Sequence, residues 1–112
     1  MERRLLGLLG LGLRSRNAVV GVDRVREAAH RGKLRVAVVA ADASPNSREK
    51  IDRLLAARGV TVISGLTAAA LGEVAGRERT AVIGVVDVQL AKGILALGTP
   101  AGASQKGSGR KG

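Results

Sequence analysis

The stretch Leu34-Arg35-Val36-Ala37-Val38-Val39-Ala40 decides the fold class of this chain. Apart from Arg35, every residue in it is apolar, and valine, a β-branched residue that favours strands, fills three of its positions. A short and nearly continuous apolar run of this kind is typical of a strand that is covered on both faces. The run therefore predicts a sheet that lies between two layers of helices.

The segments on either side of this run alternate between helical and strand patterns. Residues 22–31 have apolar side chains at helical spacing, and a cluster of cap and turn residues at 42–47 precedes an amphipathic stretch. The full pattern predicts helices at 5–13, 22–31, 48–58, 68–75 and 88–97, the fourth capped by Thr67 and ended by Gly76, and strands at 18–20, 34–40, 60–63 and 80–86. This alternation implies a three-layer α/β/α sandwich with a central, mostly four-stranded mixed sheet.

The length and composition predict one domain and a tail. A chain of 112 residues with 46% apolar content suffices for a single compact domain, which we place at residues 1–98. Glycine, serine and basic residues dominate residues 99–112, where we expect a disordered basic tail. The absence of cysteine from the sequence excludes a disulfide framework, a thiolate nucleophile and a cysteine-based zinc site, and it is compatible with the cytoplasmic location that we predict.

The charge of the chain indicates the kind of partner. Nineteen Lys and Arg residues against nine Asp and Glu give a formal net charge of +10, which favours a polyanion over a neutral small molecule. RNA, DNA and an anionic membrane surface all fit this charge. Because the chain has no Phe, Tyr or Trp, it has no aromatic platform for stacking bases. Binding to a nucleic acid must then depend on charge and on backbone contacts.

The amino-terminal segment has the outline of an export signal but lacks its decisive features. Basic residues at 3–4 precede an apolar run at 5–13, as in the charged and apolar regions of a signal peptide. The run ends at Arg14-Ser15-Arg16 with no small-residue cleavage site, and it is too short to span a membrane. A first helix packed on the domain, with no membrane association, is the better interpretation.

Enzymatic readings of the sequence fail for chemical reasons. The glycines at 7, 10 and 12 follow no strand and precede no Gly-Lys-Ser/Thr, so they do not form a phosphate loop. His30 is the only histidine and has no partner for metal binding, while Asp42, Ser44 and Ser47 have the ordinary task of capping a helix. We therefore predict a protein that is not an enzyme and needs no metal or organic cofactor.

Four short sequence segments match those of a known protein family in their order and spacing. They are Leu9-Gly10-Leu11-Gly12-Leu13, Val19-Val20-Gly21, Val38-Val39-Ala40-Ala41-Asp42-Ala43-Ser44 and Leu71-Gly72-Glu73-Val74-Ala75-Gly76. Together they resemble the kink-turn RNA-binding ribosomal proteins of the large subunit, in the bacterial branch called YlxQ, over roughly residues 3 to 97. The resemblance implies an α/β/α sandwich whose RNA-binding edge combines the start of the second helix with the loop after the fourth helix.

The RNA-recognition motif of that family is altered in this chain. Kink-turn binders typically read Gly-x-Asn-Glu (or Gln)-x-x-Lys, whereas the matching stretch here is Gly21-Val22-Asp23-Arg24-Val25-Arg26-Glu27. An ionised Asp23 can only accept hydrogen bonds and repels phosphates, and Glu27 reverses the charge of the lysine that it replaces. The ordinary structural role of Glu27 is an ion pair with Arg24 or Arg31 on its own helix. The fold can persist while the kink-turn specificity has changed.

We predict a ribosomal-protein-like RNA-binding protein, monomeric, whose partner is structured RNA, including ribosomal RNA. The open helix start at Gly21 would receive phosphate, with basic residues around it, and the two arginines of the loop after the fourth helix would add phosphate contacts. The predicted contact residues are Arg14, Arg16, Asn17, Gly21, Asp23, Arg24, Glu27, Lys33, Ala75, Gly76, Arg77 and Arg79. The alternative is an interaction module that has lost kink-turn specificity and uses its basic edge to bind an acidic ribosomal or other translation protein. It also remains open that the basic helix face is simply solvated and binds no partner.

Overall fold

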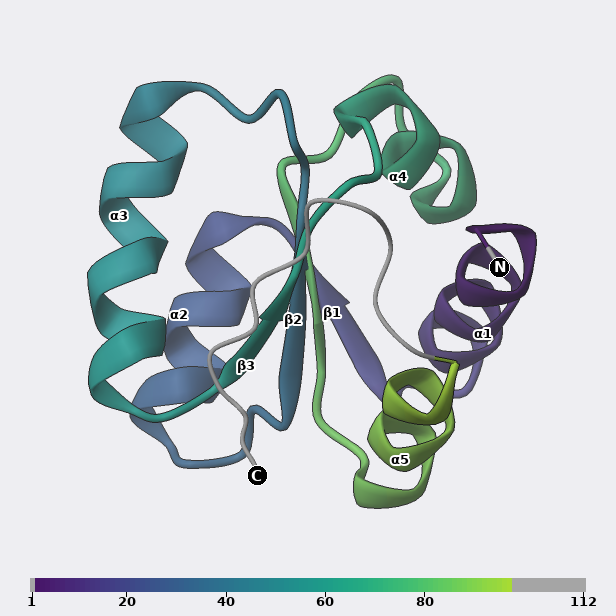
Figure 1. The fold of residues 1–112 in the computed structure, drawn as a ribbon, viewed down its shortest axis with the longest axis horizontal. Helices are drawn as coiled ribbons and strands as arrows, with labels where there is room; N and C mark the ends of the chain where they lie inside the picture. Colours follow the sequence, from purple (N-terminus) through teal and green to yellow (C-terminus); the bar gives the residue numbers. More distant parts are fainter. Residues whose placement is uncertain (1, 98–112) are drawn as a thin grey trace.

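A mixed, four-stranded sheet runs through the middle of the structure, a computed structural model that describes residues 2–97 (Figure 1). Its strands lie in the order β1-β4-β2-β3, with β2 and β3 parallel and β4 antiparallel to both of its neighbours. The elements follow one another as α1 (Glu2–Arg14), β1 (Ala18–Val20), α2 (Val22–His30), β2 (Val36–Val39), α3 (Pro45–Ala57), β3 (Thr61–Ile63), α4 (Ala68–Ala75), β4 (Val82–Val85) and α5 (Val88–Ala96).

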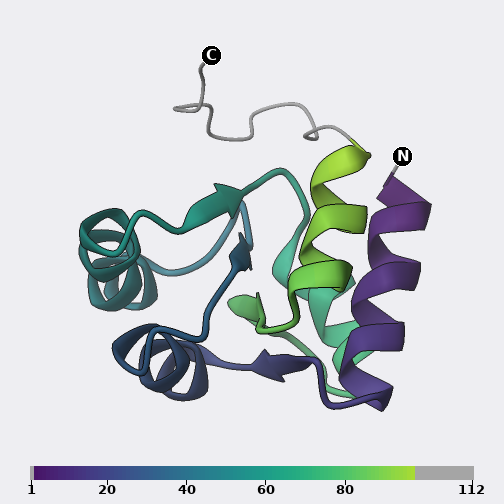
Figure 2. The same cartoon turned by 90° about the horizontal axis from the view of Figure 1, so that it is seen from below.

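Alternate side chains of the sheet enter two separate hydrophobic clusters. Val36 and Val38 of β2 face a cluster that includes buried residues of α1, α4 and α5, whereas Ala37 and Val39 face a cluster with α2 and α3. Figure 1 shows these two helical layers on opposite sides of the sheet, and Figure 2 shows α1 and α5 side by side. The predicted α/β/α sandwich and its four-stranded mixed sheet are confirmed.

Capping residues set the starts of three helices. Ser44 accepts a hydrogen bond from Ser47 N at 3.1 Å and Pro45 follows it, so α3 begins three residues before the start at 48 that we predicted. Thr67 caps α4 by accepting from Ala70 N at 3.1 Å, as predicted. Asp87 accepts from Leu90 N at 2.8 Å and caps α5. Local side-chain chemistry therefore fixes where each of these helices begins.

Three of the four strands, β2, β3 (Thr61–Ile63) and β4, are shorter than the runs that predicted them. The run at 34–40 contributes only Val36–Val39 to β2. Leu34 joins the cluster that contains α2, and Ala40 N donates to the carbonyl oxygen of Ala81, the residue before β4. The expected disordered tail at 99–112 lies outside the described residues. Across residues 2–97, the helices fall short of the length and apolar content that a membrane span requires.

Candidate nucleic-acid interface

The N-terminus of α2 is open. Gly21 occupies the N-cap position with a φ of 97°, which glycine adopts far more readily than other residues, and no side chain in the described part of the chain caps this helix. The first-turn amides and the positive end of the helix dipole are therefore available to a phosphate or another acceptor. The exposed side chains of Asp23 and Arg24 lie in the same turn.

The loop between α4 and β4 lies directly beside this helix start. The N–H of Gly21 donates to the carbonyl oxygen of Val82 at 3.0 Å, and Val20 pairs with Ile83 across the sheet. Residues 76–80, which are joined to β4 through Ala81, are thereby held next to the open end of α2. The structure thus brings together the two segments that the resemblance implied.

Asp42, which follows β2, stabilises this loop through a hydrogen bond and an ion pair. Its carboxylate accepts a hydrogen bond from Ala68 N at 2.7 Å and forms an ion pair with Arg79 at 3.3 Å. The pKa of the Asp42 carboxyl is lowered from its ordinary value, chiefly by the bond from Ala68, against the opposing effect of desolvation, and also by Arg79. We expected Asp42 to cap the helix that follows it, but Ser44 does so. Asp42 instead ties β2 to α4 and to the loop.

Gly72 lets the loop fold back onto α4. A Cβ atom at this position would lie 2.8 Å from Arg77 O and from Arg79 N and Cα, all of which are backbone atoms. The loop is also held by a hydrogen bond from Arg77 N to Gly72 O at 2.8 Å, next to the left-handed C-cap Gly76. The sequence alone did not place Gly72 or Asp42 in the site. The partners of Asp42 are distant in sequence, and the contacts of Gly72 exist only because the loop folds back onto α4.

We call the surface formed by residues 21–24, 41–44 and 76–80 the α2/α4 edge. Its charged side chains are three carboxylates and three guanidiniums, all of them exposed: Asp23, Asp42, Glu78, Arg24, Arg77 and Arg79. Arg79 is engaged by Asp42, whereas Arg24 and Arg77 form no ion pair within residues 2–97. The α2/α4 edge therefore offers directed donors and acceptors but no net positive charge.

Four of the predicted contact residues lie at the other end of the sheet. Asn17 O accepts from Val86 N at 2.9 Å, beyond the end of β4, so the turn with Arg14 and Arg16 lies a full strand away from Gly21. Lys33 follows α2 at this same far end. Our expectation that these basic residues surround Gly21 is wrong. The extended β1 separates Arg14 and Arg16 from Gly21 at about 3.3 Å per residue, and the length of α2 separates Lys33 from it.

Glu27 lies one turn beyond the α2/α4 edge and is partly neutralised. It pairs with Arg31 at 3.2 Å, which is one of the two partners that its helix offered. Both side chains are more than 60% exposed, so the pair contributes at most about 1 kcal/mol and leaves the carboxylate accessible. A carboxylate close to an approaching phosphate therefore persists on this helix. Ala75, at the end of α4, is half-buried and presents only a small surface.

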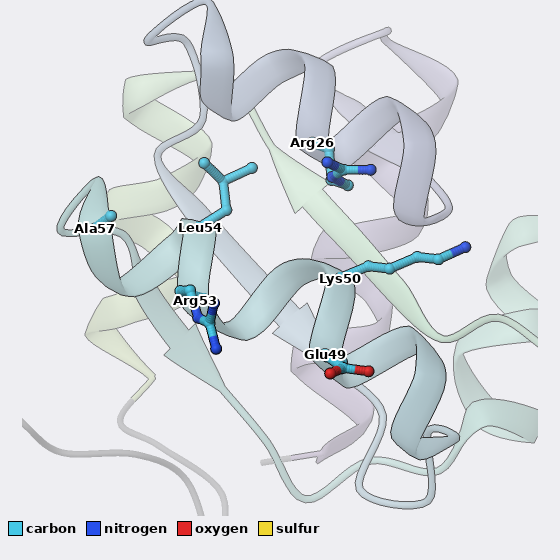
Figure 3. A pocket seen from close by; sticks show the side chains of 6 residues that line it. All are labelled: Arg26, Glu49, Lys50, Arg53, Leu54 and Ala57. Atoms are coloured by element: carbon cyan, nitrogen blue, oxygen red, sulfur yellow. The ribbon is translucent and has the colours of Figure 1, made fainter.

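An open hollow of about 430 Å³ separates α2 from α3 on the outer layer (Figure 3). It is lined by three basic residues, one carboxylate and two apolar residues: Arg26, Lys50, Arg53, Glu49, Leu54 and Ala57. Its mixed charge indicates no particular ligand. Across residues 2–97, no three His, Asp or Glu side chains gather where they could hold a metal ion.

Comparisons with known proteins place the chain in a family. Residues 3–95 match the family described as ribosomal protein L7Ae/L30e/S12e/Gadd45. Similar solved structures include a protein with unknown function from Bacillus halodurans, with 27% identity, a TM-score of 0.76 and coverage of 83% of this chain and 94% of that one. They also include the Giardia lamblia 15.5kD RNA binding protein, with 21% identity, a TM-score of 0.72 and coverage of 86% and 82%. No curated protein sequence matches the chain. Because the family match spans nearly all of the described residues, the chain belongs to the ribosomal protein L7Ae/L30e/S12e/Gadd45 family.

Proposed function

We propose that this protein is a noncatalytic RNA-binding protein that holds structured RNA, of the kink-turn type or a related fold, at the α2/α4 edge. Membership of a ribosomal protein family supports this function, and so does the fold shared with an RNA-binding protein. We further propose that it acts as a cytoplasmic monomer of the YlxQ-like bacterial branch, in contact with ribosomal RNA or with translation proteins.

The observation that carries the proposal is the hydrogen bond from Gly21 N to Val82 O. It sets the open start of α2, with its free amides, beside the arginine-bearing loop that Asp42 and Gly72 hold in place. A helix N-terminus donates to a phosphate or a base edge. Arg77, which forms no ion pair among the described residues, lies next to it and can make a bidentate phosphate contact or stack on a base. Recognition at this edge would depend on RNA shape, because the edge has no net charge to attract RNA generally.

The test compares labelled kink-turn RNA with a straight duplex of equal length by fluorescence anisotropy at several salt concentrations. We expect at least a tenfold preference for the kink-turn RNA, which corresponds to about 1.4 kcal/mol. The double variant Arg24→Gln/Arg77→Gln should lose this preference, while Arg53→Gln/Lys92→Gln, with the same charge change on α3 and α5, should keep it. Equal binding of both RNAs by the wild type would contradict shape recognition at the α2/α4 edge.

A protein-interaction module is the second candidate, favoured by one observation. The α2/α4 edge has as many carboxylates as guanidiniums, which suits a mixed-charge protein surface better than a polyphosphate. This reading predicts no RNA binding at physiological salt and a salt-dependent complex with a protein of the translation machinery. The anisotropy experiment separates the two candidates directly.

A further inference from the structure

The end of the sheet opposite the α2/α4 edge collects three connecting segments. Val36 pairs with both Val85 and Thr61, so the segment before β2, the segment before β3 and the end of β4 meet there. The α1–β1 turn joins them through the bond from Val86 N to Asn17 O at 2.9 Å. We call the surface formed by residues 14–17, 31–35 and 58–60 the basic end. In Figure 1, the connections of the basic end and those of the α2/α4 edge lie at opposite ends of the strands.

The basic end concentrates positive charge. It contains five arginines and one lysine, all exposed: Arg14, Arg16, Arg31, Lys33, Arg35 and Arg58. Of these, only Arg31 forms an ion pair within the described part of the chain, with Glu27. The adjacent carboxylate of Asp87 is occupied by the amide of Leu90. The basic end therefore has a large net positive charge, in contrast with the balanced α2/α4 edge.

Helix ends explain only part of this charge. The C-termini of α1, α2 and α3 all lie at the basic end, and each has a partial charge of about −0.5 that a nearby cation stabilises. Arg14, Arg31 and Arg58, located at those three helix ends, already exceed that requirement. Three more cations lie beyond the helix ends: Arg16, Lys33 and Arg35. Within residues 2–97, neither a helix end nor an ion pair accounts for their charge. This surplus indicates a ligand with many negative charges.

The chemistry of the basic end favours a phosphate backbone over an acidic protein. Arginine is the residue best suited to bidentate phosphate contacts, and it supplies five of the six cations. The hot spots of protein interfaces are enriched in tryptophan, tyrosine and arginine, and of these three the chain has only arginine. Contacts of guanidinium groups with phosphates need no particular base sequence.

We propose that the basic end binds the phosphate backbone of a second RNA segment, independently of sequence, while the α2/α4 edge holds the structured RNA. The protein would then connect two RNA segments that approach opposite ends of one sheet. This proposal rests on the proposed RNA-binding function. It also assigns a binding role to Arg14, Arg16 and Lys33, which lie at the end of the sheet opposite Gly21.

A capture experiment tests this arrangement. Kink-turn RNA is immobilised sparsely and loaded with protein, unbound protein is washed away, and a labelled straight RNA duplex of unrelated sequence is added at about 0.1 M salt. The wild type should capture the duplex. The variant Arg16→Gln/Lys33→Gln/Arg35→Gln should stay on the kink-turn RNA yet capture on the order of a hundredfold less duplex, because three lost phosphate contacts lower the salt slope by about 2 to 3 units.

A matched variant controls for the change in net charge. Lys50→Gln/Arg53→Gln/Lys92→Gln removes the same charge from exposed positions on α3 and α5 and should capture the duplex as the wild type does. Retention of each variant on the immobilised RNA shows that it is folded. Equal capture by the basic-end variant and the wild type would overturn the proposal, as would a wild type that stays on the kink-turn RNA without capturing the duplex. A wild type that does not bind the kink-turn RNA at all would instead refute the proposed function, and the second site with it.

Discussion

Replacement of Gly72 by alanine measures how tightly the α4–β4 loop is held against α4. The new Cβ would lie 2.8 Å from Arg77 O and from Arg79 N and Cα, whereas carbon atoms in ordinary contact are about 3.5 to 4.0 Å apart. The loop backbone must therefore move by about 0.7 Å or more. Overpacking of this kind typically costs about 1 to 3 kcal/mol, which the better helix propensity of alanine offsets by about 1 kcal/mol. We expect a net destabilisation of about 1 kcal/mol, within a range of about 0 to 2 kcal/mol.

Gly7→Ala is the matched control, because Gly7 lies in α1 and has no atom within 4 Å of an added Cβ. This variant should gain up to about 1 kcal/mol from helix propensity alone. In thermal unfolding, Gly72→Ala should therefore melt several degrees below the wild type and Gly7→Ala several degrees above it, since 1 kcal/mol shifts the Tm of a domain of this size by about 4 to 8 °C. Gly72→Ala should also weaken binding of kink-turn RNA, because Arg77 and Arg79 move with the loop. Equal Tm values for the two alanine variants would refute the inferred close contact between loop and helix.

Substitutions at three further positions test other contacts of the fold. The pKa of Asp42 is lower in the folded state than its ordinary value of 3.8. Its contribution to stability is therefore complete above 3.8 and is lost as the pH falls through the folded-state pKa. In denaturant titrations from about pH 7 to about pH 3, the difference in stability between the wild type and Asp42→Asn should shrink. A difference that grows on acidification would contradict the role of Asp42. Thr67→Ala should cost about 0.5 to 2 kcal/mol in chemical denaturation through loss of the α4 cap, and Thr67→Ser should recover most of it. Thr80→Val should be neutral or stabilising in the same assay, because the buried Thr80 hydroxyl has no hydrogen-bond partner among the described residues; a loss above about 1 kcal/mol would reveal a partner.

Local patterns predicted most of the fold because they report local physics. The valines of β2 enter both hydrophobic clusters, as a strand buried on two faces must, and Thr67 and Gly76 bound α4 through bonds within a few residues. The start of α3 was placed three residues late, since the Ser44-Pro45 cap was taken as part of a turn. This error is smaller than one turn of a helix.

The site could be predicted only in part, because it is assembled by contacts distant in sequence. Asp42 bonds to residues 26 and 37 positions away, and no local pattern reveals such partners. Arg16 is five positions from Gly21 in sequence, yet the extended β1 separates them into the basic end and the α2/α4 edge. The resemblance correctly paired the start of α2 with the α4–β4 loop, because that pairing is a property of the shared fold. Which residues contact RNA stays a prediction.

The strand order β1-β4-β2-β3 has a consequence for the behaviour of the protein at high concentration. The two strands at the borders of the sheet, β1 and β3, are also the shortest, with three residues each. An exposed border can pair with the same border of another copy and so nucleate aggregation, and a short border gives such a pair few hydrogen bonds. We therefore expect the protein to resist edge-to-edge aggregation when it is concentrated, as samples for NMR spectroscopy must be.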